Sequence, residues 1–254
     1  YFRGGGTGLN APKYSRSCQS IVSIHKAGFT LAEVLITLGI IGVVAALTLP
    51  TLIANHKKQV TVTRLKKAYN VMSQAVQFSV AEEGDIVNWE WNLDTIDFFD
   101  KYIVKHITVG ANCKMETGCW NEKGYIYDLS GAKFQSDIMK SYYRIILPDG
   151  TFVAMNNQYD GTLASSHAHI IVDVNGNQGP NAYGKDCFVL TLVATATKDY
   201  AHDIDGPGLF FFGHGLSRDS LKSGEGSCKL KGNGRFCGEM IMIDGWEMAE
   251  DYPG

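Results

Sequence analysis

The chain has 254 residues, of which 45% are hydrophobic and 19% are charged, and it carries a net charge of −3 and six cysteines. Four of the 23 Lys and Arg residues but none of the 26 Asp and Glu residues precede Phe29, so the chain from that residue onward has a net charge of −7. This acidic balance argues against a surface built mainly to neutralise phosphates, and nucleic acid is not an expected partner. After the N-terminal segment and its helix, about 170 residues remain, enough for one domain with its own core.

Residues 29–49 form an almost wholly apolar segment, with Thr30, Glu33, Thr37 and Thr48 as its only polar members. As a helix the segment would rise about 32 Å, enough to cross a hydrocarbon core. A carboxylate inside such a segment costs roughly 2.5–3.5 kcal/mol on insertion scales, so something must compensate for Glu33.

Two ordinary interpretations of this segment leave Glu33 unexplained. One is a plain membrane anchor. The other is a secretory signal peptide, with Lys26 as its charged region and a small-residue cleavage site at 44–46. Neither kind of segment favours a charge near the start of its apolar stretch.

The run KAGFTLAEVLITLGIIGVVAALTLP, residues 26–50, closely resembles the N-terminus of a type IV prepilin or a type II secretion pseudopilin. The resemblance implies that a prepilin peptidase cuts after Gly28 on the cytoplasmic face and that the new N-terminal residue, Phe29, is N-methylated. It also implies that Glu33 meets the positive N-terminus of a neighbouring subunit during assembly, and Pro50 matches a proline near the end of the family's segment. Two charges that are each costly in lipid can neutralise one another when a second copy is present.

The resemblance further implies a structural filament subunit, of a type IV pilus-like or type II secretion-like system, rather than an enzyme. Such a subunit is a single-pass protein of a bacterial inner membrane, with its head in the periplasm or on a cell-surface filament. The partners it implies are other pilin or pseudopilin copies, the prepilin peptidase and methyltransferase, and the inner-membrane assembly machinery. The positive-inside rule opposes this orientation, because only Lys26 immediately precedes the span whereas five bases follow it: Lys57, Lys58, Arg64, Lys66 and Lys67.

We expect three parts: a leader at 1–28, an N-terminal helix at 29–81, and a globular head at 82–254. Residues 1 to about 20 are polar and glycine-bearing, and we expect them to be upstream translation or a fragment edge, with Ile21 or Val22 as an alternative start. The second half of the helix is predicted to be amphipathic and to pack on the protein's own sheet. Its apolar residues recur at alternating spacings of three and four: Val62, Leu65, Tyr69, Met72 and Val76.

The predicted fold class is α+β, with the long helix packed on a mainly antiparallel, pilin-like sheet. Residues 92–103 favour a shorter helix capped by Asn92. Pro148-Asp149-Gly150 predicts a hairpin between strands at 142–147 and 151–155. The β-branched and aromatic runs at 169–174, 187–197 and 209–212 predict further strands, whereas the tail at 228–253 is assigned to neither helix nor strand.

The cysteines beyond the leader form two close pairs, Cys113 with Cys119 and Cys228 with Cys237, and leave Cys187 over. Close pairs of this kind favour two local disulfides in an oxidising compartment, although other pairings of five cysteines stay open. Neither pair has the short spacing of a zinc knuckle.

The loop at 173–186 offers oxygen ligands and loosely resembles the calcium-binding loop of major secretion pseudopilins. Its oxygen-bearing side chains are Asp173, Asn175, Asn177, Asn181 and Asp186. It departs from an EF-hand, so a turn-rich connection whose side chains bond their own backbone is the alternative. The same loop fits seven positions of a phosphate-binding loop, but an acid follows Lys185 and a strand pattern comes next, so nucleotide binding is rejected.

Histidines in the head provide the alternative function, a membrane-anchored or secreted protein with a metal-dependent hydrolase or binding head. His167 and His169 share one face of a predicted strand, and His202, Asp203, Asp205 and His214 lie downstream. Their spacing does not tie a nucleophile, a base and an orienting group together, so scattered structural histidines and no enzymatic role are expected.

Overall fold

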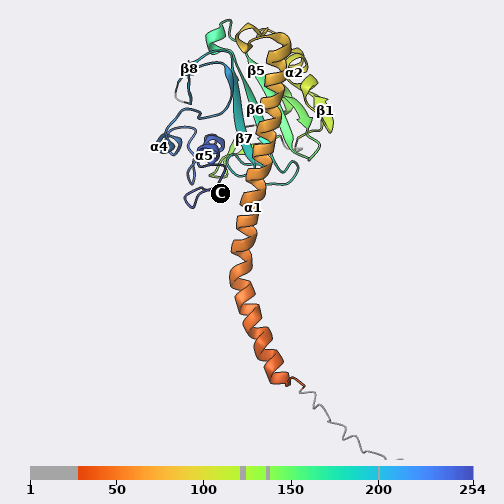
Figure 1. Cartoon of the computed structure of the whole chain (residues 1–254), viewed down its shortest axis with the longest axis vertical. Coiled ribbons are helices and arrows are strands. Elements are labelled where there is room, and N and C mark those ends of the chain that lie inside the picture. Colours follow the sequence, from red (N-terminus) through yellow and green to blue (C-terminus); the bar gives the residue numbers. More distant parts are fainter. Residues whose placement is uncertain (1–27, 121–123, 136–137, 200, 254) are drawn as a thin grey trace, which may run out of the picture. The chain divides into compact units, whose positions relative to one another are not determined.

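The computed structural model describes residues 28–120, 124–135, 138–199 and 201–253 (Figure 1). The expected leader falls almost wholly in residues 1–27, outside the described part. By its internal contacts the chain divides into two compact units, residues 1–49 and 50–254.

Helix α1 runs from Leu31 to Glu83 and contributes to both units. Its large apolar side chains up to Leu49 are exposed, including Leu31, Leu38 and Ile41. An 18-residue window of the helix has a mean hydropathy of 2.3, and by length and composition α1 is the one helix in the described residues that could cross a membrane.

From Pro50 onward α1 is amphipathic and belongs to the second unit. Its buried residues recur at spacings of three and four, as expected for one face of a helix: Val62, Leu65, Ala68, Met72, Ala75, Val76 and Ser79. Tyr69, the remaining member of the predicted stripe, is half-buried and stacks on Phe211 with 5.1 Å between ring centroids. The helix ends two residues later than predicted, followed by Gly84 at φ +83°, a conformation that glycine adopts without strain.

The head is built around a six-stranded sheet in which every neighbouring pair is antiparallel. The strands, in spatial order, are β1 (Ala111–Lys114), β4 (Tyr143–Ile146), β5 (Phe152–Gln158), β6 (His167–Asp173), β7 (Cys187–Val193) and β10 (Gly208–Phe211). Every strand residue of β7 is buried, because elements cover both of its faces. The predicted α+β class with a mainly antiparallel sheet is confirmed.

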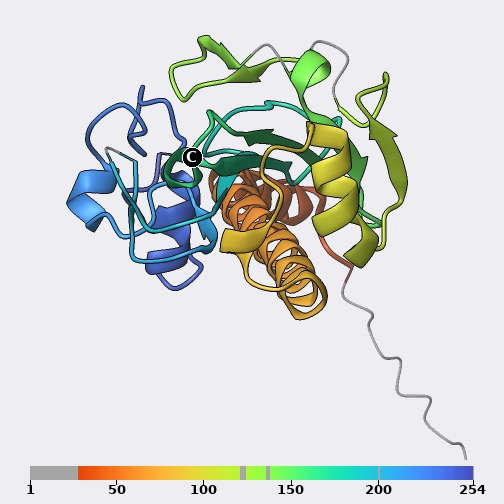
Figure 2. The ribbon, with the colours of Figure 1, turned by 90° about the horizontal axis from the view of Figure 1, so that it is seen from above.

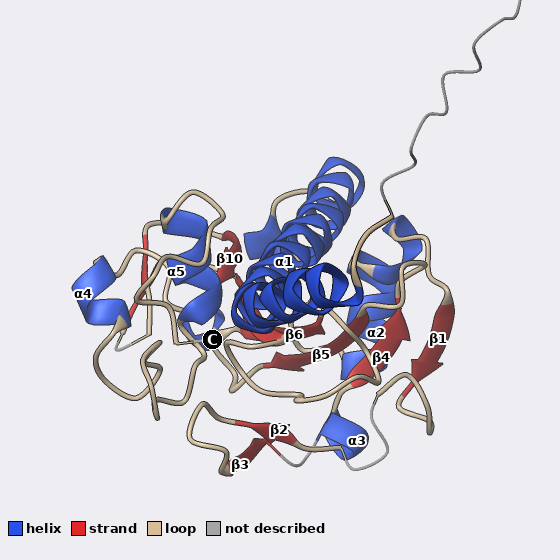
Figure 3. Cartoon of the chain, turned by 90° about the horizontal axis from the view of Figure 1, so that it is seen from below, coloured by secondary structure: helices blue, strands red, loops and turns tan. Residues whose placement is uncertain are grey.

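The two faces of the sheet have different covers. Phe211 contacts Tyr69 of α1 and pairs with Leu190, which pairs with Ile170, so these strand residues share the face that α1 covers. The alternate residues, His169 and its partner Thr191, therefore lie on the opposite face. Figures 2 and 3 show the hairpin of β2 (Ile126–Tyr127) and β3 (Lys133–Gln135) on that opposite side.

Short elements complete the head. They are α2 (Thr95–Tyr102), α3 (Ile138–Ser141), β8 (Thr197–Lys198), β9 (Asp203–Ile204), α4 (Arg218–Leu221) and α5 (Cys237–Ile243), with 3₁₀ turns at Ile86–Asn88, Val104–His106 and Leu163–Ser165. Helix α2 starts later than predicted, because Asp94 rather than Asn92 caps it by accepting a hydrogen bond from the Asp97 amide. The predicted strand at 187–197 is two strands, since β7 ends at Val193.

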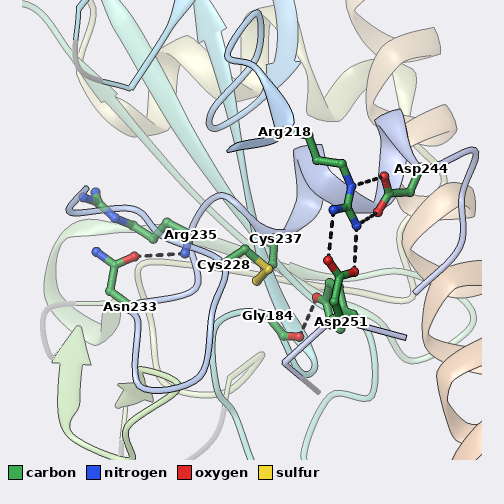
Figure 4. The surroundings of a disulfide bond; sticks show 9 residues. Gly184, Arg218, Cys228, Asn233, Arg235, Cys237, Asp244 and Asp251 are labelled. Carbon is green, nitrogen blue, oxygen red and sulfur yellow. Dashed lines mark hydrogen bonds and ion pairs between the residues drawn. A yellow bond between two sulfur atoms is a disulfide. The ribbon is translucent and has the colours of Figure 1, made fainter. Parts of the chain in front are cut away.

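The tail of the chain is fixed by a cluster of cross-links (Figure 4). Arg218 forms paired hydrogen bonds with Asp244, at the end of α5, and with Asp251. The Tyr252 hydroxyl donates to the Gly184 carbonyl at 2.6 Å. These bonds tie the segment that follows α5 to α4 and to the loop before β7.

Candidate functional site

The predicted assembly residues lie at the start of α1. Gly28, Phe29 and Thr30 precede the helix, and Phe29 is exposed. Thr30 and Glu33 form a reciprocal cap: the Glu33 amide donates to Thr30 Oγ1 at 3.2 Å, and the Thr30 amide donates to Glu33 Oε2 at 2.8 Å. This capping box satisfies amides that the first helical turn leaves without partners.

Glu33 uses only one of its carboxylate oxygens in this cap. The Thr30 hydroxyl also donates to Oε2, at 2.9 Å, whereas Oε1 has no partner among the described residues. Thr37 and Thr48 donate their hydroxyls to carbonyls one turn earlier in the helix. Glu33 Oε1 is therefore the one strong acceptor that the side chains of Leu31–Leu49 leave open in this part of the structure.

Pro50 lies inside α1, at the first residue of the second compact unit. Proline has no amide hydrogen, so the helix lacks one backbone hydrogen bond at this point. The predicted site residues thus mark both ends of the exposed apolar segment.

Three of the five bases that follow the span contact the head. Arg64 Nη1 donates to the Val174 carbonyl at 3.0 Å, and Lys67 pairs with Asp149 at 2.8 Å. Lys66 lies over the ring of Trp246 at 5.4 Å. These side chains therefore have a packing role within the head that is independent of membrane topology.

The candidate calcium loop folds around Asp186. Its carboxylate accepts hydrogen bonds from the amides of Ala182 and Asn181, at 2.7 and 2.9 Å, and from the Asn175 side-chain amide at 3.1 Å. Asp173 Oδ1 accepts from the amides of Asn175 and Gly176. The loop side chains thus bond their own backbone, as the alternative interpretation expected, while Asn177 is exposed.

The same loop leaves three buried oxygen atoms without hydrogen-bond partners among the described residues: Asp173 Oδ2, Asn175 Oδ1 and Asn181 Oδ1. Burial and the nearby Asp186 charge raise the pKa of Asp173 to about 8. Burial also raises the pKa of Asp186 and of the Cys187 thiol. Oxygen atoms of this kind are the ligands that calcium prefers.

The cysteines pair in the structure as the spacing favoured. Cys113 bonds to Cys119, Cys228 bonds to Cys237, and Cys187 is free and buried in β7. The second bridge connects the loop after α4 to the first turn of α5.

The structure brings together only some of the histidines that the sequence singled out. His167, His169 and His202 line one cavity, together with Arg235, which sequence reasoning missed. His214 lies elsewhere, with Nδ1 3.0 Å from Glu239 Oε1. Within the described ranges, no three His, Cys, Asp or Glu side chains are arranged to hold a metal ion, so the hydrolase alternative gains no metal centre from them.

Comparison with known families adds two matches. Residues 24–49 match the prokaryotic N-terminal methylation motif, which supports a type IV pilin-like prepilin cleavage segment. Residues 51–254 match a family of unknown function, DUF6613. Neither a curated protein nor a solved structure matches the chain. The chain therefore belongs to the DUF6613 family of unknown function, and a prepilin-type segment precedes the region that this family covers.

Proposed function

We propose that this protein is a structural subunit of a type IV pilus-like or type II secretion-like filament. Before assembly it is held in a bacterial inner membrane by residues 29–49, with its head in the periplasm, and afterwards it forms part of the filament. The observation that carries the proposal is the methylation motif over the apolar segment 29–49, whose single acid, Glu33, keeps one oxygen unpaired.

Processing at the Gly28–Phe29 bond is consistent with the local geometry. Helix α1 begins at Leu31, so both residues of the bond lie outside the helix, and Phe29 is exposed. A prepilin peptidase could therefore bind this segment in an extended form without unwinding a helical turn. Cleavage frees the amine of Phe29, which the same class of enzyme methylates.

Glu33 supplies the charge that registers one subunit against the next. Oε2 caps its own helix, while Oε1 is open to a donor from outside the chain. An N-terminal amine of a neighbouring copy matches this acceptor in charge, and pairing offsets the cost of holding each ion in an apolar environment. The partners are accordingly further copies of this chain or of related pilins.

Apolar burial sustains the polymer. The large side chains of Leu31–Leu49 are exposed in the single chain and must be covered by lipid or by other helices. In the filament the N-terminal helices cover one another. The contacts of Arg64, Lys66 and Lys67 with the head support this orientation, because these bases are explained without placing them in the cytoplasm.

The decisive experiment separates the charge of Glu33 from its capping role. Glu33→Gln keeps a capping-box residue but removes the charge, and Thr30→Ala removes the capping hydroxyl but keeps the charge. We expect Glu33→Gln to lower the sheared filament fraction at least about tenfold while monomer remains in the membrane, because the interchain ion pair is lost. Thr30→Ala should still assemble.

Mass spectrometry of the membrane-extracted protein tests processing independently. A chain that begins with methylated Phe29 is expected. A chain that begins at Leu47 would indicate a secretory signal peptide cut after Ala46, and a retained basic leader would indicate a plain anchor. Normal assembly of Glu33→Gln would also contradict the proposal.

A second proposal concerns the loop at 173–186, where three buried oxygens without partners favour a cation. We propose that calcium binds there, held by Asp173, Asn175, Asn181 and Asp186, and that it rigidifies the loop. Calcium should bind the wild-type full chain in titration calorimetry and raise its melting temperature. Asp186→Asn should abolish this binding and the exposed control Asp205→Asn should not. Unchanged binding in Asp186→Asn would refute this site.

A further inference from the structure

A cavity of about 560 Å³ lies at one end of the sheet, on the face opposite α1. Strands β5, β6 and β7 form its floor, and the segments around β8 and before α5 form its walls. Its volume is in the range of small-molecule sites. The cavity belongs entirely to the second unit, so ligand binding there does not depend on filament assembly.

Three imidazoles converge in this cavity. His167 and His169 are neighbours on one face of β6, with ring centroids 4.8 Å apart, and His169 lies directly opposite Thr191 of β7. His202 joins them from the segment between β8 and β9.

Phe212 organises the polar groups of the cavity. The rings of His169 and His202 meet it edge-on, at 6.0 and 4.8 Å between centroids. The guanidinium of Arg235 lies 4.5 Å from the same ring and 5.2 Å from that of Phe134. One aromatic side chain thus holds two imidazoles and a cation in fixed positions.

Arg235 is a cation without a counter-ion among the described residues. Its Nε is buried and has no hydrogen-bond partner there, and its side chain points away from the Cys228–Cys237 bridge (Figure 4). Among the described residues that line the cavity, the one acid is Asp199, which His202 engages at 3.2 Å. A guanidinium with no partner favours a carboxylate, which it can bind with two parallel hydrogen bonds.

Burial favours the neutral form of two of these imidazoles, His169 and His202. Burial, with the charges of His167 and Arg235, lowers the pKa of His169 to about 3, and burial lowers that of His202 as well. His202 donates from Nδ1 to the Asp199 carboxylate, and His167 donates from Nδ1 to the Ser165 carbonyl at 2.8 Å. In the neutral ring of His202, Nε2 then carries a lone pair.

Two buried polar atoms of the cavity wall have no partner in the part of the chain that the structure describes. They are Nε2 of His202, a residue only 5% exposed, and Oγ1 of Thr191, only 1% exposed. An unpaired acceptor and an unpaired hydroxyl at these depths favour a ligand that brings hydroxyl groups.

We propose that this cavity binds an acidic sugar, a polyhydroxylated ring that carries a carboxylate. The carboxylate pairs with Arg235, while ring hydroxyls donate to Nε2 of His202 and exchange a hydrogen bond with Thr191. An inorganic anion would bring no ring hydroxyl to the His202 lone pair, and a neutral sugar would leave the guanidinium unpaired.

Titration calorimetry on the detergent-solubilised full chain tests the proposal with galacturonate, glucuronate and N-acetylneuraminate as probes. At least one of these acids should bind at millimolar concentration, about tenfold or more tighter than galactose or inorganic phosphate. Arg235→Gln should weaken that binding at least about tenfold, and Arg235→Lys should weaken it less. His202→Phe should weaken it about threefold to tenfold, because only the hydrogen-bonding nitrogens are removed.

Lys229→Gln is the matched control, since this exposed base lies outside the cavity and its replacement changes the net charge equally. It should leave affinity unchanged, and circular dichroism should show that all variants are folded. Equal binding of galactose would remove the carboxylate from the proposal, and equal binding of phosphate would make the cavity a general oxyanion site. Failure of all three acids to bind, or full binding by Arg235→Gln, would overturn it.

Discussion

The two halves of α1 bury their apolar side chains in different ways. From Pro50 onward one stripe of the helix faces the sheet, with Leu65 and Met72 fully buried. Before Pro50 the apolar residues surround the whole helix, and Leu38 and Ile41 remain about 60% exposed.

The difference shows where each half finds its partner. An amphipathic helix finds its apolar partner within its own chain, whereas a helix that is apolar all round requires lipid or other proteins. The head is therefore a unit with its own core, while residues 29–49 are complete only in a bilayer or an assembly.

A matched pair of truncations tests this contrast most strongly. Leu65→Ala should lower the free energy of unfolding of the head by about 2–5 kcal/mol, because it leaves a cavity beneath the sheet. Leu38→Ala should change that free energy by less than about 0.5 kcal/mol, since the side chain touches no core. Chemical denaturation of the full chain in detergent gives both values, and equal losses would show that the halves do not differ in this way.

The disulfides test how far the head depends on cross-links as well as on its core. Replacing Cys228 and Cys237 by alanine should cost about 3 kcal/mol, because the bridge closes a loop and both residues are fully buried. Replacing Cys113 and Cys119 should cost about 2 kcal/mol, since that loop is shorter and Cys113 is only half-buried. Thermal unfolding of the two double variants measures the order, and the reverse order would contradict it.

The pH dependence of stability tests the loop at 173–186, where buried oxygen atoms lack hydrogen-bond partners among the described residues. The pKa of Asp173 is about 8 in the folded chain, against an ordinary value near 3.8, so between these pH values the folded chain keeps a proton that the unfolded chain has lost. Stability should therefore fall as pH rises through this window, by up to about 1.4 kcal/mol per pH unit.

Asp173→Asn should flatten that slope, leaving only the contribution of Asp186, whose pKa is raised in the same direction. Denaturant titrations between about pH 5 and 8, with a chelator present so that no cation competes, provide the measurement. A variant as steep as the wild type would show that Asp173 is ionised throughout.

The smallest expected effect concerns the bases that follow the span. Lys67→Gln should lower head stability by at most about 1 kcal/mol, because the Lys67 side chain in its ion pair with Asp149 is 58% exposed. Membrane orientation should not change, and protease protection of the head in spheroplasts checks this. An inverted head would show that Lys67 acts on topology and not only on packing.

Local patterns predicted most of the fold. The stripe from Val62 to Val76 predicted the buried face of α1, while β-branched and aromatic runs and the Pro148-Asp149-Gly150 turn predicted the main strands. The predicted cap of α2, Asn92, was wrong because Asn and Asp are equally good N-cap residues. Asp94 caps the helix instead, in the arrangement that buries Phe98 and Phe99.

The candidate sites were predictable to different degrees. Thr30 and Glu33 are three residues apart, so the sequence contains the pattern of a capping box. From the sequence, Glu33 was interpreted only as a charge in an apolar segment, and this cap was not predicted. The cavity was not predictable, because Arg235 and His169 are 66 positions apart and meet only through the packing around Phe212. Similarly, no spacing rule reveals that Asn175 and Asn181 leave buried oxygens unpaired.

The folded-back carboxylate at the helix start has a kinetic implication for the proposed polymer. Because Glu33 Oε2 already accepts bonds from Thr30, a subunit that joins the proposed fibre adds a donor to the open Oε1 of a carboxylate that is already partly paired. The electrostatic free energy gained when a subunit is added is then modest, and the electrostatic barrier to removing that subunit is correspondingly low. In the fibre that we propose, subunits could therefore be added and removed singly, without a deep electrostatic minimum at each contact between neighbours.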